Sequence, residues 1–168
     1  MSTRVKRWAL GVLGVIALGL AAALAYLEWP RLYPPVVARA PLDPGCDLRA
    51  GPCRVAFDQG GEVTLSIEPR DIPLVKPLRL RVGLQGLVPD GVEIDFSGLS
   101  MNMGFNRVPL AEAGPGSYVG QAMLPVCVRN RMDWEARVLL RTPAGYLEAP
   151  FRFDTYRIAP PEATPPGQ

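Results

Sequence analysis

The stretch that decides the fold is residues 62–68, which read EVTLSIE and alternate between polar and apolar side chains. Strict alternation predicts a β-strand with one buried face, because successive side chains on a strand point to opposite faces. Residues 78–84 (LRLRVGL) repeat the pattern further along the chain. The two runs predict a sheet with one face in a core.

Other short apolar or alternating runs surround this pair, with turn residues such as Gly60-Gly61 and Pro89-Asp90-Gly91 between them. Strand signals about 8–12 residues apart are typical of all-β sandwiches and barrels. We therefore predict an all-β, immunoglobulin-like β-sandwich of about seven strands. The other expected strand regions are residues 54–58, 92–96, 101–108, 117–124, 134–140 and 147–153.

The start of the chain predicts its location. Residues 8–27 are twenty positions without a charge. As a helix with about 1.5 Å rise per residue they would span about 30 Å, the thickness of a bilayer core. Arg4, Lys6 and Arg7 precede this stretch, and the positive-inside rule keeps such residues cytoplasmic. We expect a single-pass inner-membrane protein whose C-terminal domain is periplasmic.

A cleaved signal peptide is the alternative, since Ala23-Leu24-Ala25 fits an A-x-A cleavage site. The apolar stretch before it exceeds the usual core of about 7–15 residues, which favours a retained anchor. Either way, the remaining chain is exported. The expected parts are a cytoplasmic tip (1–7), an anchor (8–27), a Pro-rich spacer (28–45), a β-sandwich domain (46–158) and a disordered tail (159–168).

Composition narrows the function classes. The chain has no histidine, which excludes Ser-His-Asp catalysis and His-ligated zinc or haem. Its 18 Lys and Arg face 16 Asp and Glu, which is no basic excess for binding nucleic acid. The pairs Glu93 with Asp95 and Asp133 with Glu135 share strand faces, as on the water-facing side of a sandwich. We expect no enzyme and no nucleic-acid partner.

Sulfur-containing side chains form the candidate metal site. Thioethers and thiolates are soft ligands that select Cu(I). If residues 101–108 are a strand, Met101 and Met103 point to the same face. The alternative is that the methionines fill gaps in the core, although Asn102 and Gly104 favour an exposed edge or loop. The candidate ligands are Met101, Met103, Met123, Cys127 and Met132.

The three cysteines predict one disulfide. Cys46 and Cys53 are seven positions apart, and thiols outside the cytoplasm meet an oxidising compartment. Gly51-Pro52 supplies a turn between them. Cys127 remains as a candidate thiolate ligand, while its pairing with Cys46 or Cys53 stays open as an alternative.

A family resemblance rests on an ordered set of short motifs. Met101-Asn102-Met103-Gly104 is followed by Gly116-Ser117-Tyr118, by the Trp-led run 134–140 and by a last strand near the C-terminus. This order, over roughly residues 62–153, resembles the YtkA-like and FixH-like membrane-anchored, extracytoplasmic β-sandwich domains. The resemblance implies an accessory role in metal handling or respiratory-oxidase assembly. Members often place a histidine near the Met-rich segment, and this chain has none.

Two functions follow as hypotheses. The first is a membrane-tethered extracytoplasmic accessory protein that handles Cu(I) through Met and Cys ligands. The alternative is a non-catalytic interaction module that helps a membrane complex assemble. Convergence of the sulfur atoms on an open rim would favour the first, and their scatter or complete burial would favour the second.

Overall fold

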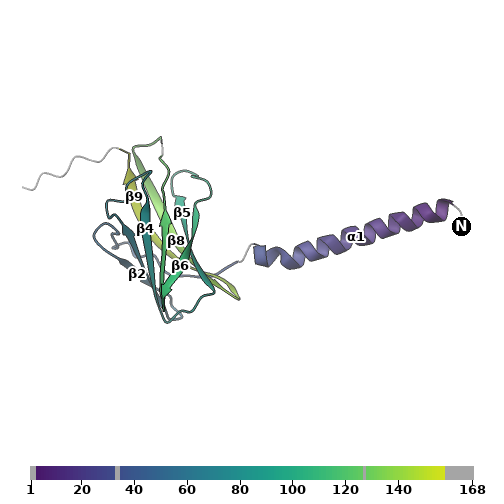
Figure 1. Cartoon of the computed structure of the whole chain (residues 1–168), viewed down its shortest axis with the longest axis horizontal. Coiled ribbons are helices and arrows are strands. Elements are labelled where there is room, and N and C mark those ends of the chain that lie inside the picture. The colour runs from purple at the N-terminus through teal and green to yellow at the C-terminus, as the bar shows by residue number, and fades with distance from the viewer. Residues whose placement is uncertain (1–2, 33–34, 127, 158–168) are drawn as a thin grey trace, which may run out of the picture. The chain divides into compact units, whose positions relative to one another are not determined.

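The computed structural model describes residues 3–32, 35–126 and 128–157 (Figure 1). It divides into a helical unit that ends at Pro35 and a β unit that begins at Val36. The boundary thus falls inside the expected spacer 28–45. Cys127 and the expected tail 159–168 lie outside the described residues.

The helical unit consists of α1 (Thr3–Leu32), which contains the uncharged stretch 8–27. Alanine and leucine dominate this stretch, and both have high helix propensity. Within α1, the structure describes the side chains of Trp8 and residues 11–26, and all of these are exposed. No helix in the described part of the chain combines the length and hydropathy needed to span a bilayer.

The β unit is a single curled sheet, which confirms the all-β class. Within the described residues it has nine strands rather than about seven. They are β1 (Val36–Arg39), β2 (Cys53–Ala56), β3 (Glu62–Glu68), β4 (Leu78–Gln85), β5 (Gly91–Gly98), β6 (Arg107–Gly114), β7 (Ser117–Ala122), β8 (Arg131–Thr142) and β9 (Gly145–Tyr156). Their spatial order is β1-β9-β8-β5-β6-β7-β4-β3-β2.

Strand β6 turns the sheet back on itself. Its first residues pair with β5, and its last residues pair with β7. The two halves of the sheet enclose the core, and β2 of one half contacts β9 of the other (Figure 1). In β3 the apolar residues Val63, Leu65 and Ile67 are at most 1% exposed, so the predicted alternation is confirmed.

The predicted strand 101–108 was wrong in its first part. Residues 99–106 form a loop, and β6 begins only at Arg107. The Asn102 side chain accepts a hydrogen bond from the Gly104 N–H at 2.8 Å, and Gly104 has φ +77°. Such a side-chain turn competes with strand pairing, and a positive φ favours glycine. The same-face relation expected for Met101 and Met103 therefore does not hold.

Strand β1 lies within the predicted spacer. It pairs in parallel with β9 and extends the sheet at one edge. The Ala40 N–H continues this pairing by donating to the Glu148 carbonyl at 2.8 Å. Strand β1 has only four residues, and its first two are both exposed. Buried and exposed side chains therefore do not alternate clearly enough to predict this strand from the sequence.

Three loops lie at the end of the β unit that we call the loop end: residues 69–77, 99–106, and 123–126 with 128–130. They follow β3, β5 and β7, respectively. The segment 40–52 between β1 and β2 lies at this end too, since it lines one pocket with Leu99 and Ser100. The Val75 N–H donates to the Leu124 carbonyl at 2.9 Å, which joins the first and third loops. Val36 pairs with Tyr146 beside the β8–β9 turn, so β1 begins at the opposite end.

Candidate functional site

The Met103 and Met132 side chains meet beside Gly98, the last residue of β5. A Cβ atom added to Gly98 would lie 3.0 Å from Met103 Cγ and would overlap the Cε methyl of Met132. It would also lie 2.5 Å from the Met101 carbonyl oxygen. The structure thus brings the side chains of two predicted ligands, Met103 and Met132, together beside one glycine, with the backbone of a third, Met101, next to them. We call this group the sulfur cluster.

The members of the sulfur cluster differ in burial. Met132 is 2% exposed, and Ser100 Oγ donates a hydrogen bond to its Sδ atom at 3.4 Å. Met101 and Met103 are half-buried and pack against the core. Residues 97–104 line a hollow of about 480 Å³ beside them. The cluster is therefore neither scattered nor sealed, because two of its members reach the surface.

Two predicted ligands are not placed in the sulfur cluster. Met123 follows the end of β7, in the other half of the sheet, and is 51% exposed. Cys127 lies outside the described residues. Among the residues that the structure describes, no group of three or more Cys, Asp or Glu side chains is arranged to hold a metal ion.

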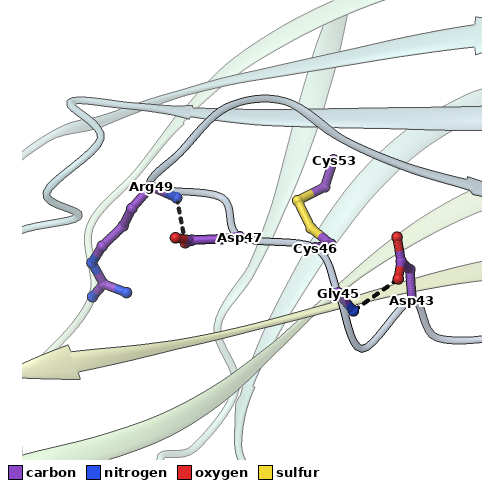
Figure 2. The surroundings of a disulfide bond; sticks show 6 residues. All are labelled: Asp43, Gly45, Cys46, Asp47, Arg49 and Cys53. Atoms are coloured by element: carbon purple, nitrogen blue, oxygen red, sulfur yellow. Dashed lines mark hydrogen bonds between the residues drawn. A yellow bond between two sulfur atoms is a disulfide. The ribbon is translucent and has the colours of Figure 1, made fainter.

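The predicted Cys46–Cys53 disulfide is confirmed, with 5.6 Å between the two Cα atoms (Figure 2). Asp43 Oδ1 accepts from the Gly45 N–H at 2.8 Å, and Asp47 Oδ1 accepts from the Arg49 N–H at 2.9 Å (Figure 2). These side-chain turns shape the chain around the bridge.

An arginine and aspartate group lies next to the disulfide loop. Asp154 forms ion pairs with Arg49 at 2.8 Å and with Arg131 at 3.1 Å. Desolvation raises the pKa of Asp154, but a hydrogen bond from Tyr156 and the two arginines outweigh it and lower the pKa overall. The same hydrogen bond raises the pKa of Tyr156. The charges of Asp133, Tyr156 and Asp154 raise the pKa of Arg131.

A larger pocket of about 720 Å³ lies beside the disulfide. Trp134, Phe153 and Leu99 supply its apolar surface, and the arginine and aspartate group supplies charged walls. It shares Leu99 and Ser100 with the hollow beside the sulfur cluster. The two cavities therefore adjoin at the start of the 99–106 loop.

The prediction that the paired carboxylates form a water-facing surface was wrong for Asp95 and Glu135, which are 7% and 6% exposed. Arg137 covers Asp95 with an ion pair of 2.5 Å. Arg39 and Arg152 bind Glu135 at 3.0 and 3.2 Å. These arginines come from other strands, so only the strand register reveals the pairing. Both carboxylates are occupied by ion pairs and do not form a free acid–base couple.

The chemistry open to the site follows from its donors. Thioether sulfur atoms are soft, uncharged ligands that suit Cu(I), whereas Zn²⁺ prefers thiolate, imidazole or carboxylate. Comparisons with protein-family models, curated proteins and solved structures find no match to this chain.

Proposed function

We propose that this chain is a membrane-tethered extracytoplasmic accessory protein that binds Cu(I) through the thioethers of Met101, Met103 and Met132. The meeting of the Met103 and Met132 side chains beside Gly98 is the observation that supports the proposal, and Met101 is included because it lines the same hollow as Met103. A glycine at this position leaves room for two methionine side chains from separate parts of the chain. A larger residue would displace at least one of them.

The donor set fits Cu(I) without help from histidine. Cu(I) is stable with soft sulfur ligands alone, and the half-buried Met101 and Met103 give it a route from the surface. Met132 holds the inner side of the site, where Ser100 orients its sulfur atom. Met123 is left out of this ligand set, because it follows β7 in the other half of the sheet. Cys127 lies outside the described residues and is not part of the ligand set either.

The membrane tether is part of this proposal and rests on the N-terminal sequence. Arg4, Lys6 and Arg7 precede the twenty uncharged residues 8–27. In α1, large apolar side chains such as Leu13, Val15 and Leu18 are 68–77% exposed. A helix that is apolar on all sides is suited to lipid. The immunoglobulin-like description and the YtkA-like or FixH-like resemblance belong to the same proposal.

Anaerobic Cu(I) competition against a chromophoric chelator tests the site. The double variant Met103→Leu, Met132→Leu keeps volume and apolarity, so the free energy of unfolding should change by less than about 1.5 kcal/mol per site. We expect its Cu(I) affinity to fall at least about tenfold, which corresponds to about 1.4 kcal/mol. Met123→Leu is the matched control, because it removes a thioether outside the sulfur cluster. Equal affinities in wild type and the double variant would refute the proposal.

A non-catalytic interaction module is the second candidate. Exposed apolar side chains in the loops of the loop end favour it, with Phe105 at 83% and Val128 at 80%. Such residues commonly mark a surface that contacts another protein. If the double methionine variant bound Cu(I) as wild type does, while Phe105→Ser abolished assembly of a co-purifying membrane complex, this second function would replace the first.

A further inference from the structure

The pocket beside the disulfide is built from four separate parts of the chain. Residues 42–49 form one wall, and the start of the 99–106 loop, residues 131–134 of β8 and residues 152–154 of β9 form the others. Its volume of about 720 Å³ falls within the range of about 300–1,000 Å³ that is typical of small-molecule sites. The Cys46–Cys53 disulfide constrains the first wall. The fold therefore provides a preformed cavity of the size of a ligand.

The inner surface of the pocket is aromatic. Trp134 and Phe153 line it and are 0% and 8% exposed. The Trp134 Nε1–H donates a hydrogen bond to Thr155 Oγ1 at 2.9 Å, and Phe153 packs edge-on against Phe96. These contacts hold both rings in place. A ligand that fills the pocket therefore needs an apolar body to contact them.

The arginines that line the pocket are already paired with carboxylates. Each forms an ion pair at 2.8–3.2 Å, so an anionic ligand would have to compete with a carboxylate of the protein. The pairs are Arg49 with Asp154, Arg131 with Asp133, and Arg152 with Glu135. Arg70 reaches the same segment of chain, but it donates to the Ala50 carbonyl at 3.0 Å.

Asp43 and Asp47 are the two pocket carboxylates that no cation neutralises. Neither forms an ion pair with any residue that the structure describes. Their Oδ1 atoms accept from the N–H groups of Gly45 and Arg49 at 2.8 and 2.9 Å, which fixes the two side chains on either side of Cys46 (Figure 2). The lining contains three arginines and four aspartates, a net charge of −1 (three minus four). The uncompensated charge of the pocket is therefore negative.

We propose that this pocket binds an organic cation, an amine or guanidinium group joined to an apolar body. The apolar body contacts Trp134 and Phe153, and the positive charge faces Asp43 and Asp47, which attract it. In the described part of the chain no three Cys, Asp or Glu side chains are arranged to hold a metal ion, which favours an organic cation over a metal. The Cu(I) site plays no part in this binding.

Isothermal titration calorimetry on the full chain in a non-ionic detergent tests the proposal. Three probes share one phenylethyl body and differ in charge: phenethylamine, 2-phenylethanol and 3-phenylpropionate. At about 0.01 M salt we expect the amine to bind at least about tenfold more tightly than the alcohol, and the carboxylate to bind most weakly. At about 1 M salt the difference should shrink, because the screening length falls from about 30 Å to about 3 Å.

A fourth probe, the blocked dipeptide acetyl-Phe-Lys-amide, distinguishes the two sources of such a cation. Tighter binding of the dipeptide than of phenethylamine assigns the ligand to a basic side chain of a protein. Tighter binding of phenethylamine assigns it to a free amine.

A double variant tests the role of the two carboxylates. Asp43→Asn with Asp47→Asn removes both charges but keeps an Oδ1 acceptor for each backbone N–H. The affinity for phenethylamine should fall about tenfold, toward that of the alcohol, while the affinity for the alcohol stays within about twofold. Asp58→Asn with Asp90→Asn is the matched control, because both aspartates are exposed and neither lines the pocket. It should leave both affinities unchanged.

Three results would overturn the proposal. Equal binding of the amine and the alcohol at low salt, or tightest binding of 3-phenylpropionate, would remove the preference for a cation. Absence of binding by every probe would remove the ligand site itself. An unchanged amine affinity in the Asp43→Asn, Asp47→Asn variant would remove the role of the two carboxylates. Each of these results leaves the Cu(I) proposal intact, because Cu(I) affinity is measured separately.

Discussion

At the scale of single residues, Gly98 decides whether the sulfur cluster can exist. From sequence it resembles any glycine at the end of a strand. Its importance comes from Met103 and Met132, which approach it from a loop and from β8. The chemistry of thioethers is enough to propose every methionine of the β unit as a ligand. Only the tertiary fold shows that Met103 and Met132 lie together near Met101 and that Met123 lies elsewhere.

Replacing Gly98 by alanine should therefore disrupt the cluster. The new methyl group would overlap Met132 and crowd Met103, and overpacking of this kind costs about 1–3 kcal/mol of unfolding free energy. We expect Cu(I) affinity, measured by chelator competition, to fall about tenfold or more. Gly51→Ala is the control, since no atom lies within 4 Å of an added Cβ there. Wild-type Cu(I) affinity in Gly98→Ala would contradict the proposed site.

The Asp154 and Tyr156 pair gives a prediction about pH. The hydrogen bond to Asp154 raises the pKa of Tyr156, so Asp154→Asn should return that pKa toward the ordinary value of about 10. In wild type the pKa of Asp154 is lowered, so its stabilising effect is present above an ordinary aspartate pKa and is lost as pH falls through the lowered value. NMR titration of the Tyr156 ring measures the first effect, and an unchanged pKa in Asp154→Asn would contradict it.

At the scale of elements, the sequence reveals best those strands that alternate along their whole length. Strand β3 begins and ends where alternation predicts, because each second residue is in the core. The 99–106 loop departs from prediction because the Asn102 turn is a local competitor of pairing. Strand β1 was not predicted for the opposite reason: its own sequence shows no clear alternation, and its hydrogen bonds come from β9, which is distant in the sequence.

Arg39 should anchor β1 to the sheet. Its guanidinium binds Glu148 and Glu135, which are 3% and 6% exposed. Arg39→Ala would leave these buried carboxylates with fewer partners, and we expect a loss of about 1–3 kcal/mol in urea unfolding. The control is Arg54→Ala, because the Arg54 ion pair with Glu62 is at the other edge and more exposed, and should cost at most about 1 kcal/mol. Equal losses in the two variants would contradict a special role for Arg39.

At the scale of the whole molecule, the proposed membrane tether and the proposed Cu(I) site rest on different parts of the sequence. The uncharged stretch 8–27 and the tip cations bear only on location. The sulfur cluster belongs to the β unit and lies at its loop end. This end is opposite to Val36, the first residue of the β unit.

The proposed orientation of the chain in a membrane is testable directly. Under the proposed topology, a periplasm-active reporter fused after Gln168 should be active, because the positive-inside rule would keep Arg4, Lys6 and Arg7 in the cytoplasm, while the charges of Glu28 and Arg31 cancel on the other side. Replacing the three tip cations by glutamate should strongly reduce reporter activity, since only the cation difference between the flanks orients the helix. N-terminal sequencing of the mature protein completes the test. A mature terminus at Tyr26 would refute the anchor but leave export intact, whereas an inactive reporter would refute both.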